Sequence, residues 1–147
     1  MAFFLFDTSA LVKRYHLEPG SDKVDEIFED TDNVLIISEL ALVEVTSALL
    51  RKRNRGEITA SAMENALAQF ARDVLSELIV ADLTSDLVHR AREMVLKHNL
   101  RTLDALQLAF ALGFQALKPT PAFVCADVRL GDAAQAAELT VLDPETS

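Results

Sequence analysis

Hydrophobic residues gather along the chain in five short runs, and longer segments of mixed polarity separate these runs. The runs are rich in β-branched and aromatic residues, which favour strands. They lie at residues 2–6, 34–37, 78–80, 122–125 and 139–142. The intervening segments predict helices near residues 8–15, 21–30, 39–54, 60–76, 85–98, 103–115 and 128–137. Strands that alternate with helices indicate an α/β protein, and strands that are apolar throughout are typical of a parallel sheet covered on both faces.

The expected architecture is therefore an α/β/α sandwich of three layers around a mostly parallel sheet of about five strands. The predicted helices at 39–54 and 60–76 follow each other without an intervening strand and meet at Gly56, so a protruding hairpin is expected. The chain has 147 residues, half of them hydrophobic, which suffices for one core. No repeat or linker interrupts residues 1–147, and a single domain is expected.

The charge balance is acidic, with 14 Lys and Arg residues against 23 Asp and Glu residues and a net charge of −9. Such a chain is unsuited to binding nucleic acid through its overall charge, so a bound polyanion would need a local basic patch or a metal ion. Cys125 is the one cysteine of the sequence, which excludes an intramolecular disulfide and favours a reducing compartment. No apolar run resembles a signal peptide or approaches the roughly 18 residues of a membrane span. We expect a cytoplasmic protein with no membrane association.

Two aspartates stand at the carboxyl ends of predicted strands. The run at 2–6 ends directly on Asp7, and Asp127 follows the run at 122–125 by two residues. In an open parallel sheet, ligand sites form at the carboxyl ends of the strands, so both carboxylates would share one crevice if the two strands are neighbours. Each aspartate is also well placed to cap the following helix, and for one residue alone capping is the simpler interpretation.

Two further acids stand in segments that are otherwise apolar. Glu44 lies in SELALVEVTSALLRKR, where apolar residues cover nearly every face of the predicted helix, as in a buried helix. Asp104 begins a second apolar helix, for which Thr102 is the expected N-cap, and no Lys or Arg occurs from Thr102 to Leu117. Burying an ionised carboxylate without a partner is costly in free energy, so these acids predict a function.

A divalent cation would relieve both the burial and the mutual repulsion of four carboxylates. Mg²⁺ and Mn²⁺ prefer oxygen ligands and keep positions for water and phosphate. Zinc is disfavoured, because Cys125 has no partner Cys or His at ligand spacing. A cation held by acids beside a phosphodiester can activate water and stabilise the charge that develops on the phosphate. The residues therefore predict metal-assisted phosphodiester hydrolysis, with the hydroxyls of Thr8 or Ser9 as candidate supporting groups.

Four segments of the chain resemble the acidic motifs of PIN-domain nucleases, and specifically those of the VapC-type toxins of type II toxin–antitoxin pairs. They are DTSALVKRY, SELALVEVTSALLR, LRTLDALQLAFA and FVCADVRLGDAA, and they occur in the family's order. The resemblance implies an endoribonuclease dependent on Mg²⁺ or Mn²⁺. It assigns the metal-binding and catalytic roles to Asp7, Glu44, Asp104 and Asp127. The family commonly has Thr or Ser two residues before its last acid, where this chain has Cys125.

The resemblance also implies the partners of the protein. VapC-type toxins cleave RNA, form homodimers, and are silenced by a small VapB-like antitoxin whose C-terminal segment covers the active-site groove.

Three arginines are candidates for binding the substrate. The run RKRNR at 51–55 suits the negative end of a helix dipole, and Arg51 and Arg53 are equally candidates for phosphate contacts. Arg14, two turns after Asp7, is a third candidate for substrate binding.

Two other functions compete with this hypothesis. Haloacid-dehalogenase-like phosphatases also place an Asp after the first strand, but they need a second Asp two residues later, where this chain has Ser9. The stronger alternative is a PIN-like fold that has lost catalysis and binds RNA or a protein partner. Cys125 keeps this alternative open, and metal binding with RNA cleavage in wild type and in Asp7→Asn would decide between the two.

Overall fold

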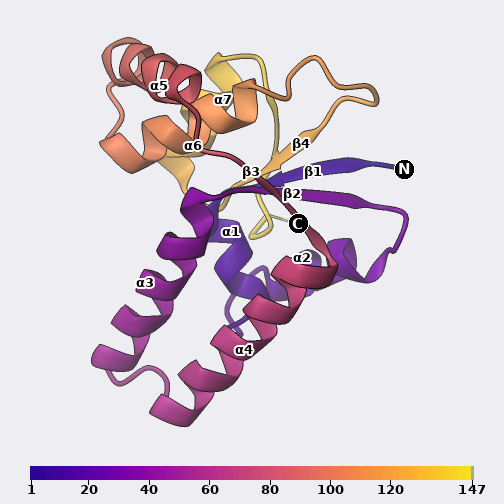
Figure 1. Cartoon of the computed structure of the whole chain (residues 1–147), viewed down its shortest axis with the longest axis vertical. Helices are drawn as coiled ribbons and strands as arrows, with labels where there is room; N and C mark the ends of the chain where they lie inside the picture. Colours follow the sequence, from indigo (N-terminus) through magenta and orange to yellow (C-terminus); the bar gives the residue numbers. More distant parts are fainter. Residues whose placement is uncertain (147) are drawn as a thin grey trace.

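The computed structural model describes residues 1–146 and is built around a five-stranded sheet (Figure 1). The strands are β1 (Phe3–Phe6), β2 (Val34–Ser38), β3 (Leu78–Ala81), β4 (Ala122–Val124) and β5 (Thr140–Leu142). Their order is β3-β2-β1-β4-β5, and all four neighbouring pairs are parallel. The predicted α/β class and the parallel sheet of about five strands are confirmed.

Seven α-helices connect and flank the strands in the described part of the chain. They are α1 (Thr8–Leu11), α2 (Ser21–Glu29), α3 (Leu40–Asn54), α4 (Ala60–Ser76), α5 (Ser85–His98), α6 (Thr102–Leu112) and α7 (Val128–Ala136). Two helices differ from the prediction by more than one residue at an end. The segment predicted as one helix at 8–15 is a single α turn followed by the 3₁₀ turn η1 (Val12–Arg14). Helix α6 ends at Leu112 because Gly113, a weak helix former, leads into turns with hydrogen bonds from residue i+3 to residue i.

The core lies on both faces of the sheet, as the three-layer prediction requires. Successive strand residues point to opposite faces, so Phe6 and Ile37 pack with α1, α2, α3 and α4, whereas Leu5 and Ile36 pack with α5, α6 and α7. All four of these side chains are buried. Figure 1 shows the two groups of helices on opposite sides of the strands.

Helices α3 and α4 form the expected hairpin, which extends away from the sheet in Figure 1 and turns at Gly56 with a φ of 76°. The prediction that the first helix is buried on all sides is wrong. Its buried residues are Ala41, Val45 and Leu49, which recur every four positions, whereas Val43 is 69% exposed. Because the hairpin extends beyond the sheet, the core covers one stripe of α3 only, and apolar side chains remain at the surface.

The order in which successive strands are added to the sheet changes direction at β1. The chain proceeds from β1 to β2 and β3 on one side, and then crosses to β4 and β5 on the other side. Strands β1 and β4 are therefore neighbours, and the main-chain N–H of Asp7 donates to the carbonyl of Val124 at 3.0 Å. Such a switch point between parallel strands is where α/β folds place ligand sites.

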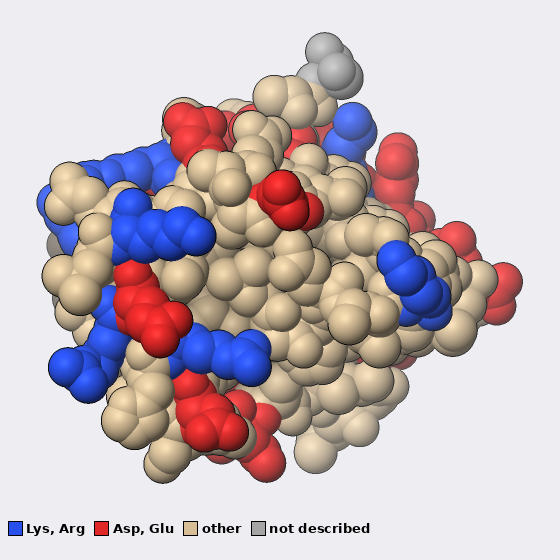
Figure 2. Space-filling model, turned by 90° about the horizontal axis from the view of Figure 1, so that it is seen from above, with Lys and Arg blue, Asp and Glu red and all other residues tan. Residues whose placement is uncertain are grey.

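Charged side chains are unevenly distributed on the face shown in Figure 2, which looks onto the side of the molecule that carries α5 and α7. Basic and acidic side chains alternate at the left of this view, and a broad region beside them carries few charges. Among residues 1–146, none of the helices is both long enough and apolar enough to cross a membrane.

Candidate active site

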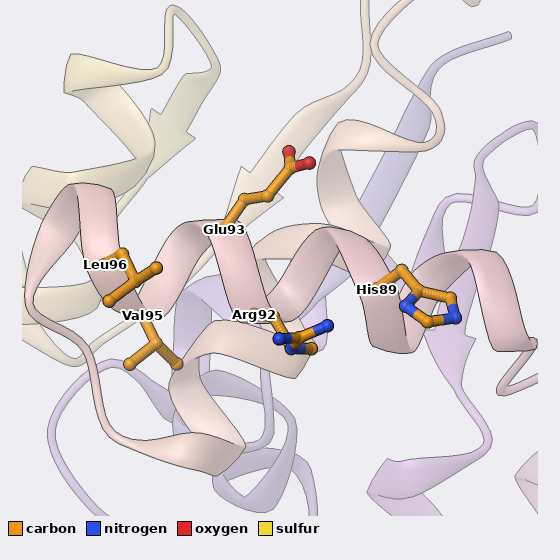
Figure 3. A pocket seen from close by; sticks show the side chains of 5 residues that line it. All are labelled: His89, Arg92, Glu93, Val95 and Leu96. Atoms are coloured by element: carbon orange, nitrogen blue, oxygen red, sulfur yellow. The ribbon is translucent and has the colours of Figure 1, made fainter.

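Hollows on the surface differ in the residues that they bring together. The hollow of about 540 Å³ in Figure 3 is lined by His89, Arg92, Glu93, Val95 and Leu96, which all come from α5. A smaller hollow of about 180 Å³ is lined by side chains of three separate segments, and it contains one of the predicted acids. Its lining residues are Thr8, Leu40, Val43, Glu44, Ser47, Arg51 and Leu103. Of these two hollows, the smaller is the one that a predicted acid lines.

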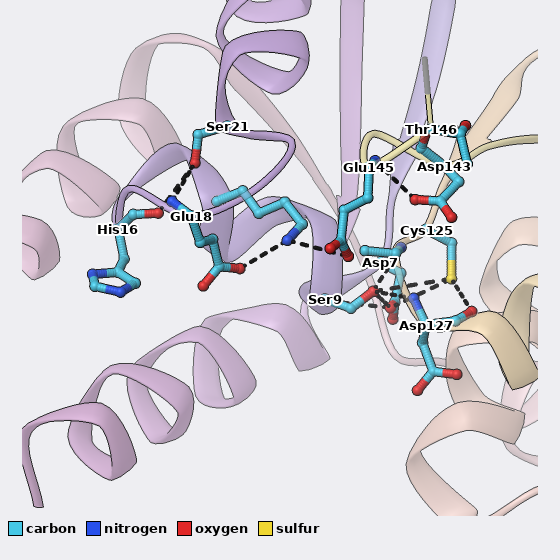
Figure 4. A network of polar contacts seen from close by, with 12 residues as sticks. Asp7, Ser9, His16, Glu18, Ser21, Cys125, Asp127, Asp143, Glu145 and Thr146 are labelled. Atoms are coloured by element: carbon cyan, nitrogen blue, oxygen red, sulfur yellow. Dashed lines mark hydrogen bonds and ion pairs between the residues drawn. The ribbon is translucent and has the colours of Figure 1, made fainter. Parts of the chain in front are cut away.

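Asp7 lies at the switch point and is 5% exposed. It is the N-cap of α1, as its position before a helix allows, and its Oδ2 accepts the main-chain N–H of Ser9 at 3.2 Å. The hydroxyl of Ser9 donates to the same oxygen (Figure 4). Capping therefore leaves the predicted metal-binding role of Asp7 open, because the cap engages one carboxylate oxygen.

Ser9 also connects the ends of the two central strands. Its Oγ accepts the main-chain N–H of Ala126 at 3.0 Å and that of Asp127 at 3.2 Å. The segment after β4 is thereby held against the segment after β1. The sequence marks Ser9 as a nearby hydroxyl, but only the pairing of β1 with β4 shows which main-chain groups it binds.

Glu44 is held at its Oε1 by two donors from different elements. The hydroxyl of Thr8 donates to this oxygen at 3.1 Å, and Nε2 of Gln107 donates to it at 2.8 Å. Nε2 of Gln107 also contacts Oγ1 of Thr8 at 3.3 Å. Gln107, which sequence reasoning did not select, lies on α6 one turn after Asp104. Its polar side chain in an apolar helix was the signal that could have identified it.

Asp127 and Asp104 lie at the starts of α7 and α6. Asp127 is the N-cap of α7, and its Oδ1 accepts the main-chain N–H of Leu130 at 3.0 Å. Asp104 is the third residue of α6, whose N-cap is Arg101 and not Thr102 as predicted. Arg101 takes the extended backbone conformation of a cap, so the helix begins at Thr102.

Basic residues also lie nearer to Asp104 than the sequence of its helix suggested. The charges of Arg101 and Arg129 both lower the pKa of Asp104. Arg101 directly precedes α6, whereas Arg129 belongs to α7. Both arginines lie outside α6, so the sequence of this helix alone does not show them.

Burial and mutual repulsion raise the pKa values of three of the predicted acids. Burial raises the pKa of Asp7 to about 6, and the charges of Glu44 and Asp104 add to the increase, whereas the hydrogen bonds from Ser9 oppose it. Burial, followed by the charge of Asp104, also raises the pKa of Glu44. Burial and then the charge of Asp127 raise the pKa of Asp104. The four carboxylates are thus electrostatically coupled, which a cation between them would relieve.

The four acids offer oxygen ligands of the kind that a hard divalent cation binds. Asp7, Glu44 and Asp127 each accept their hydrogen bonds through a single oxygen, and within the described residues no hydrogen bond falls on the other oxygen. Carboxylate oxygens are the ligands that Mg²⁺ and Mn²⁺ prefer. Within residues 1–146, no three Asp, Glu, His or Cys side chains are already close enough together to hold a metal ion. Metal binding by the four acids therefore stays a prediction.

Cys125 occupies the position where the family commonly has a hydroxyl. It is 2% exposed, and its Sγ contacts the carbonyl oxygen of Asp127 at 3.4 Å and Oδ2 of Asp7 at 3.8 Å. Burial raises the pKa of the thiol, so it stays neutral beside the acids. A thiol is a weaker hydrogen-bond donor and acceptor than a hydroxyl, so Cys125 makes weaker contacts here than Thr or Ser could make.

The three arginines predicted to bind substrate have different surroundings. Arg14 donates to Asp25 at 2.8 Å, lies 3.8 Å from Asp73 and stacks over the ring of Phe28, so it connects helices of the core. Arg51 lines the hollow at Glu44, and its charge lowers the pKa of that acid. Arg53 is exposed in the last turn of the same helix. Their roles in substrate binding stay predictions, and Arg51 is best placed.

Comparison with known families identifies the family of this chain. Residues 4–117 match the family model of the PIN domain. The chain belongs to the PIN-domain family. This result confirms the resemblance that the four acidic motifs indicate, and the matched range contains Asp7, Glu44 and Asp104.

Two curated relatives of this PIN-domain protein come from Mycobacterium tuberculosis and are named as VapC ribonucleases. Ribonuclease VapC49 is 32% identical over 112 residues, which cover 76% of each chain. Ribonuclease VapC35 is 30% identical over 139 residues, which cover 94% of each chain. The similarity to VapC35 therefore extends over nearly the whole length of both proteins.

Solved structures share the fold at lower identity. The VapC20 toxin of Mycobacterium tuberculosis, described as cleaving the sarcin–ricin loop, has a TM-score of 0.67 and 19% identity over 93% of this chain and 96% of that one. VapBC2 from Rickettsia felis, bound to a promoter DNA fragment, has a TM-score of 0.64 and 14% identity over 95% and 97%. A toxin–antitoxin complex from Klebsiella pneumoniae has a TM-score of 0.63 and 19% identity over 96% and 97%. These similarities show the PIN-domain fold.

Proposed function

We propose that this PIN-domain protein is a metal-dependent endoribonuclease and the toxin of a type II toxin–antitoxin pair. The observation that carries the proposal is the hydrogen bonding of three of the four acids, because within residues 1–146 Asp7, Glu44 and Asp127 each accept through one carboxylate oxygen and leave the other without a hydrogen bond. The names of the VapC relatives supply the substrate class, which is RNA.

Asp7, Glu44, Asp104 and Asp127 would hold Mg²⁺ or Mn²⁺. Such an ion, when bound, lowers the pKa of a bound water and stabilises negative charge on the phosphodiester. The chain itself contributes the orientation of the acids. Ser9 holds one oxygen of Asp7, whereas Thr8 and Gln107 hold one oxygen of Glu44. A cation would offset the burial and the mutual repulsion that raise the pKa values of Asp7, Glu44 and Asp104.

Local cations are proposed to offset the net charge of −9 when RNA binds. Arg51 shares a hollow with Glu44, and Arg53 follows in the last turn of α3. Lys52, which lies between them, contacts Glu18 at 3.0 Å and Glu57 at 3.8 Å. The two arginines are therefore better suited than Lys52 to contact phosphates. An RNA substrate also fits the expected cytoplasmic location.

A small VapB-like antitoxin is the proposed partner at the α3–α4 hairpin. An apolar groove of about 410 Å³ there includes Leu42, Phe70 and Leu75, and Leu75 is 88% exposed. Leu42 and Thr46 of this groove lie about 160° around α3 from Glu44, so a partner seated here would reach the candidate active site only by continuing around the helix. Two of the structural neighbours are toxin–antitoxin or VapBC assemblies, which supports a partner of this kind.

A homodimer is proposed through the outer face of α5. Leu96 is 86% exposed and Val88 is 43% exposed, and the hollow of Figure 3 lies on the same helix. Light scattering should detect a dimer in wild type and a monomer in Leu96→Lys. The variant Leu75→Lys should stay dimeric and should lose the co-expressed antitoxin.

The test of the nuclease is single-turnover cleavage of a structured RNA with Mn²⁺ and with EDTA. Wild type should cleave only with Mn²⁺, Asp104→Asn should lose cleavage, and Asp132→Asn, which changes an exposed aspartate of α7, should match wild type. Cleavage in EDTA, or full activity of Asp104→Asn, would refute the assignment. RNA binding without metal-dependent cleavage would favour the alternative of a binding module.

A further inference from the structure

We propose that Gln107 and Thr8 form a clamp that positions Glu44 for the metal ion, a role that rests on the proposed function. The clamp consists of these two side chains. Both donate to Oε1 of Glu44, at 2.8 Å from Gln107 and 3.1 Å from Thr8. In the described residues no donor reaches Oε2, so this oxygen is left to face a ligand.

The burial of Gln107 is the first argument for the clamp. Its side chain is 1% exposed in a helix whose buried neighbours are Ala105, Leu108, Ala109 and Phe110. A buried amide is favourable only when its polar atoms are paired. Nε2 of Gln107 is paired with Glu44 and Thr8, whereas its Oε1 is buried and, among residues 1–146, has no partner. An apolar residue would fill this position without that cost, so packing alone does not account for the glutamine.

The orientation of the amide is the second argument. If the amide were flipped, its oxygen would face the carboxylate of Glu44 and the two acceptors would repel each other. The charge of Glu44 therefore keeps the NH₂ group of Gln107 in place and leaves the amide oxygen unpaired. Within residues 1–146, holding the Glu44 carboxylate in place thus leaves one buried amide oxygen of Gln107 without a hydrogen bond.

The positions of the clamp residues are the third argument. Thr8 directly follows Asp7, and Gln107 lies one helical turn after Asp104. The contacts among Thr8, Gln107 and Glu44 consequently connect the segments that carry three of the four acids. A change in the clamp should therefore alter the mutual arrangement of the acids.

The test measures Mn²⁺ affinity by calorimetry on the metal-free protein without RNA. Gln107→Met keeps the length of the side chain and removes the donors, and Thr8→Val removes a hydroxyl at nearly constant shape. Each should weaken Mn²⁺ binding about tenfold, as expected when a residue that orients a metal ligand is lost. Thr8→Ser keeps the hydroxyl and should bind Mn²⁺ with an affinity close to that of wild type. Gln115→Met changes an exposed glutamine beyond α6 and should leave affinity unchanged.

Thermal unfolding in EDTA separates positioning from simple stability. Gln107→Met should melt within a few degrees of wild type, because it removes an unpaired amide oxygen together with two donors. If that variant does not fold, the comparison of Thr8→Val with Thr8→Ser still tests the clamp. Unchanged Mn²⁺ affinity in Gln107→Met and Thr8→Val would overturn the clamp while leaving the metal site intact. No Mn²⁺ binding by wild type, or unchanged binding by Asp104→Asn, would overturn the proposed function as well.

Discussion

The hydroxyl of Ser9 accepts the main-chain N–H of Asp127 at 3.2 Å, although 118 residues separate the two positions. The same hydroxyl donates to the carboxylate of Asp7. One side chain thus connects the first and the last of the four acids. With Thr8 bound to Glu44 and Gln107, two adjacent residues join all four acidic segments.

Ser9→Ala should lower the free energy of unfolding by about 1–3 kcal/mol, since it leaves the main-chain N–H groups of Ala126 and Asp127 without their acceptor. Urea denaturation measures this change. Ser76→Ala, which removes an exposed hydroxyl bonded within α4, should change stability by less than about 0.5 kcal/mol. Equal effects of both substitutions would show that Ser9 does not join the two strand ends.

The metal-free protein should lose stability as the pH rises from about 4 to about 6. The folded state raises the pKa of Asp7 from 3.8 to about 6, so it binds more protons than the unfolded state across this interval. The corresponding loss is about 3 kcal/mol as an upper value. Asp7→Asn should be less sensitive to pH and more stable than wild type at pH 7 in EDTA. Parallel profiles of wild type and variant in urea denaturation would contradict the burial of a charged Asp7.

Mn²⁺ or Mg²⁺ should raise the melting temperature of wild type. An ion that binds the folded state alone stabilises it by about 2.7 kcal/mol at a concentration one hundred times Kd. The increase should disappear with EDTA and in Asp7→Asn, whereas Asp132→Asn should retain it. An increase of the same size in Asp7→Asn would place the metal at another site.

Replacing both Arg51 and Arg53 with Ala should weaken RNA binding while leaving Mn²⁺ affinity nearly unchanged. The slope of log affinity against log salt concentration should become shallower by about 0.7 for each phosphate that the protein no longer neutralises. Fluorescence anisotropy at several salt concentrations measures both quantities. Arg90→Ala changes an exposed arginine of α5, on the opposite face of the sheet from α3, and should match wild type. An unaltered slope in the double variant would exclude the end of α3 from the RNA surface.

The fold could be predicted largely from local pattern. The five strands and the seven helical segments follow from apolar runs and helical periodicity, because these signals depend on neighbouring residues. The carboxyl-end positions of Asp7 and Asp127 were also visible in the sequence. The burial of α3 was misjudged, since a hairpin that leaves the sheet exposes Val43, and no pattern within the helix reports where the sheet ends.

The sequence by itself thus determined the fold class and the family, since these rest on local hydrophobic patterns and short motifs, and it supplied the four acids of the predicted site. The tertiary structure alone decided which groups surround those acids. Gln107 reaches Glu44 across 63 positions, and Arg129 approaches Asp104 from another helix. Hydrogen bonds and charge interactions act through space at a few ångströms, so the surroundings of a site depend on strand order and helix packing rather than on distance along the chain.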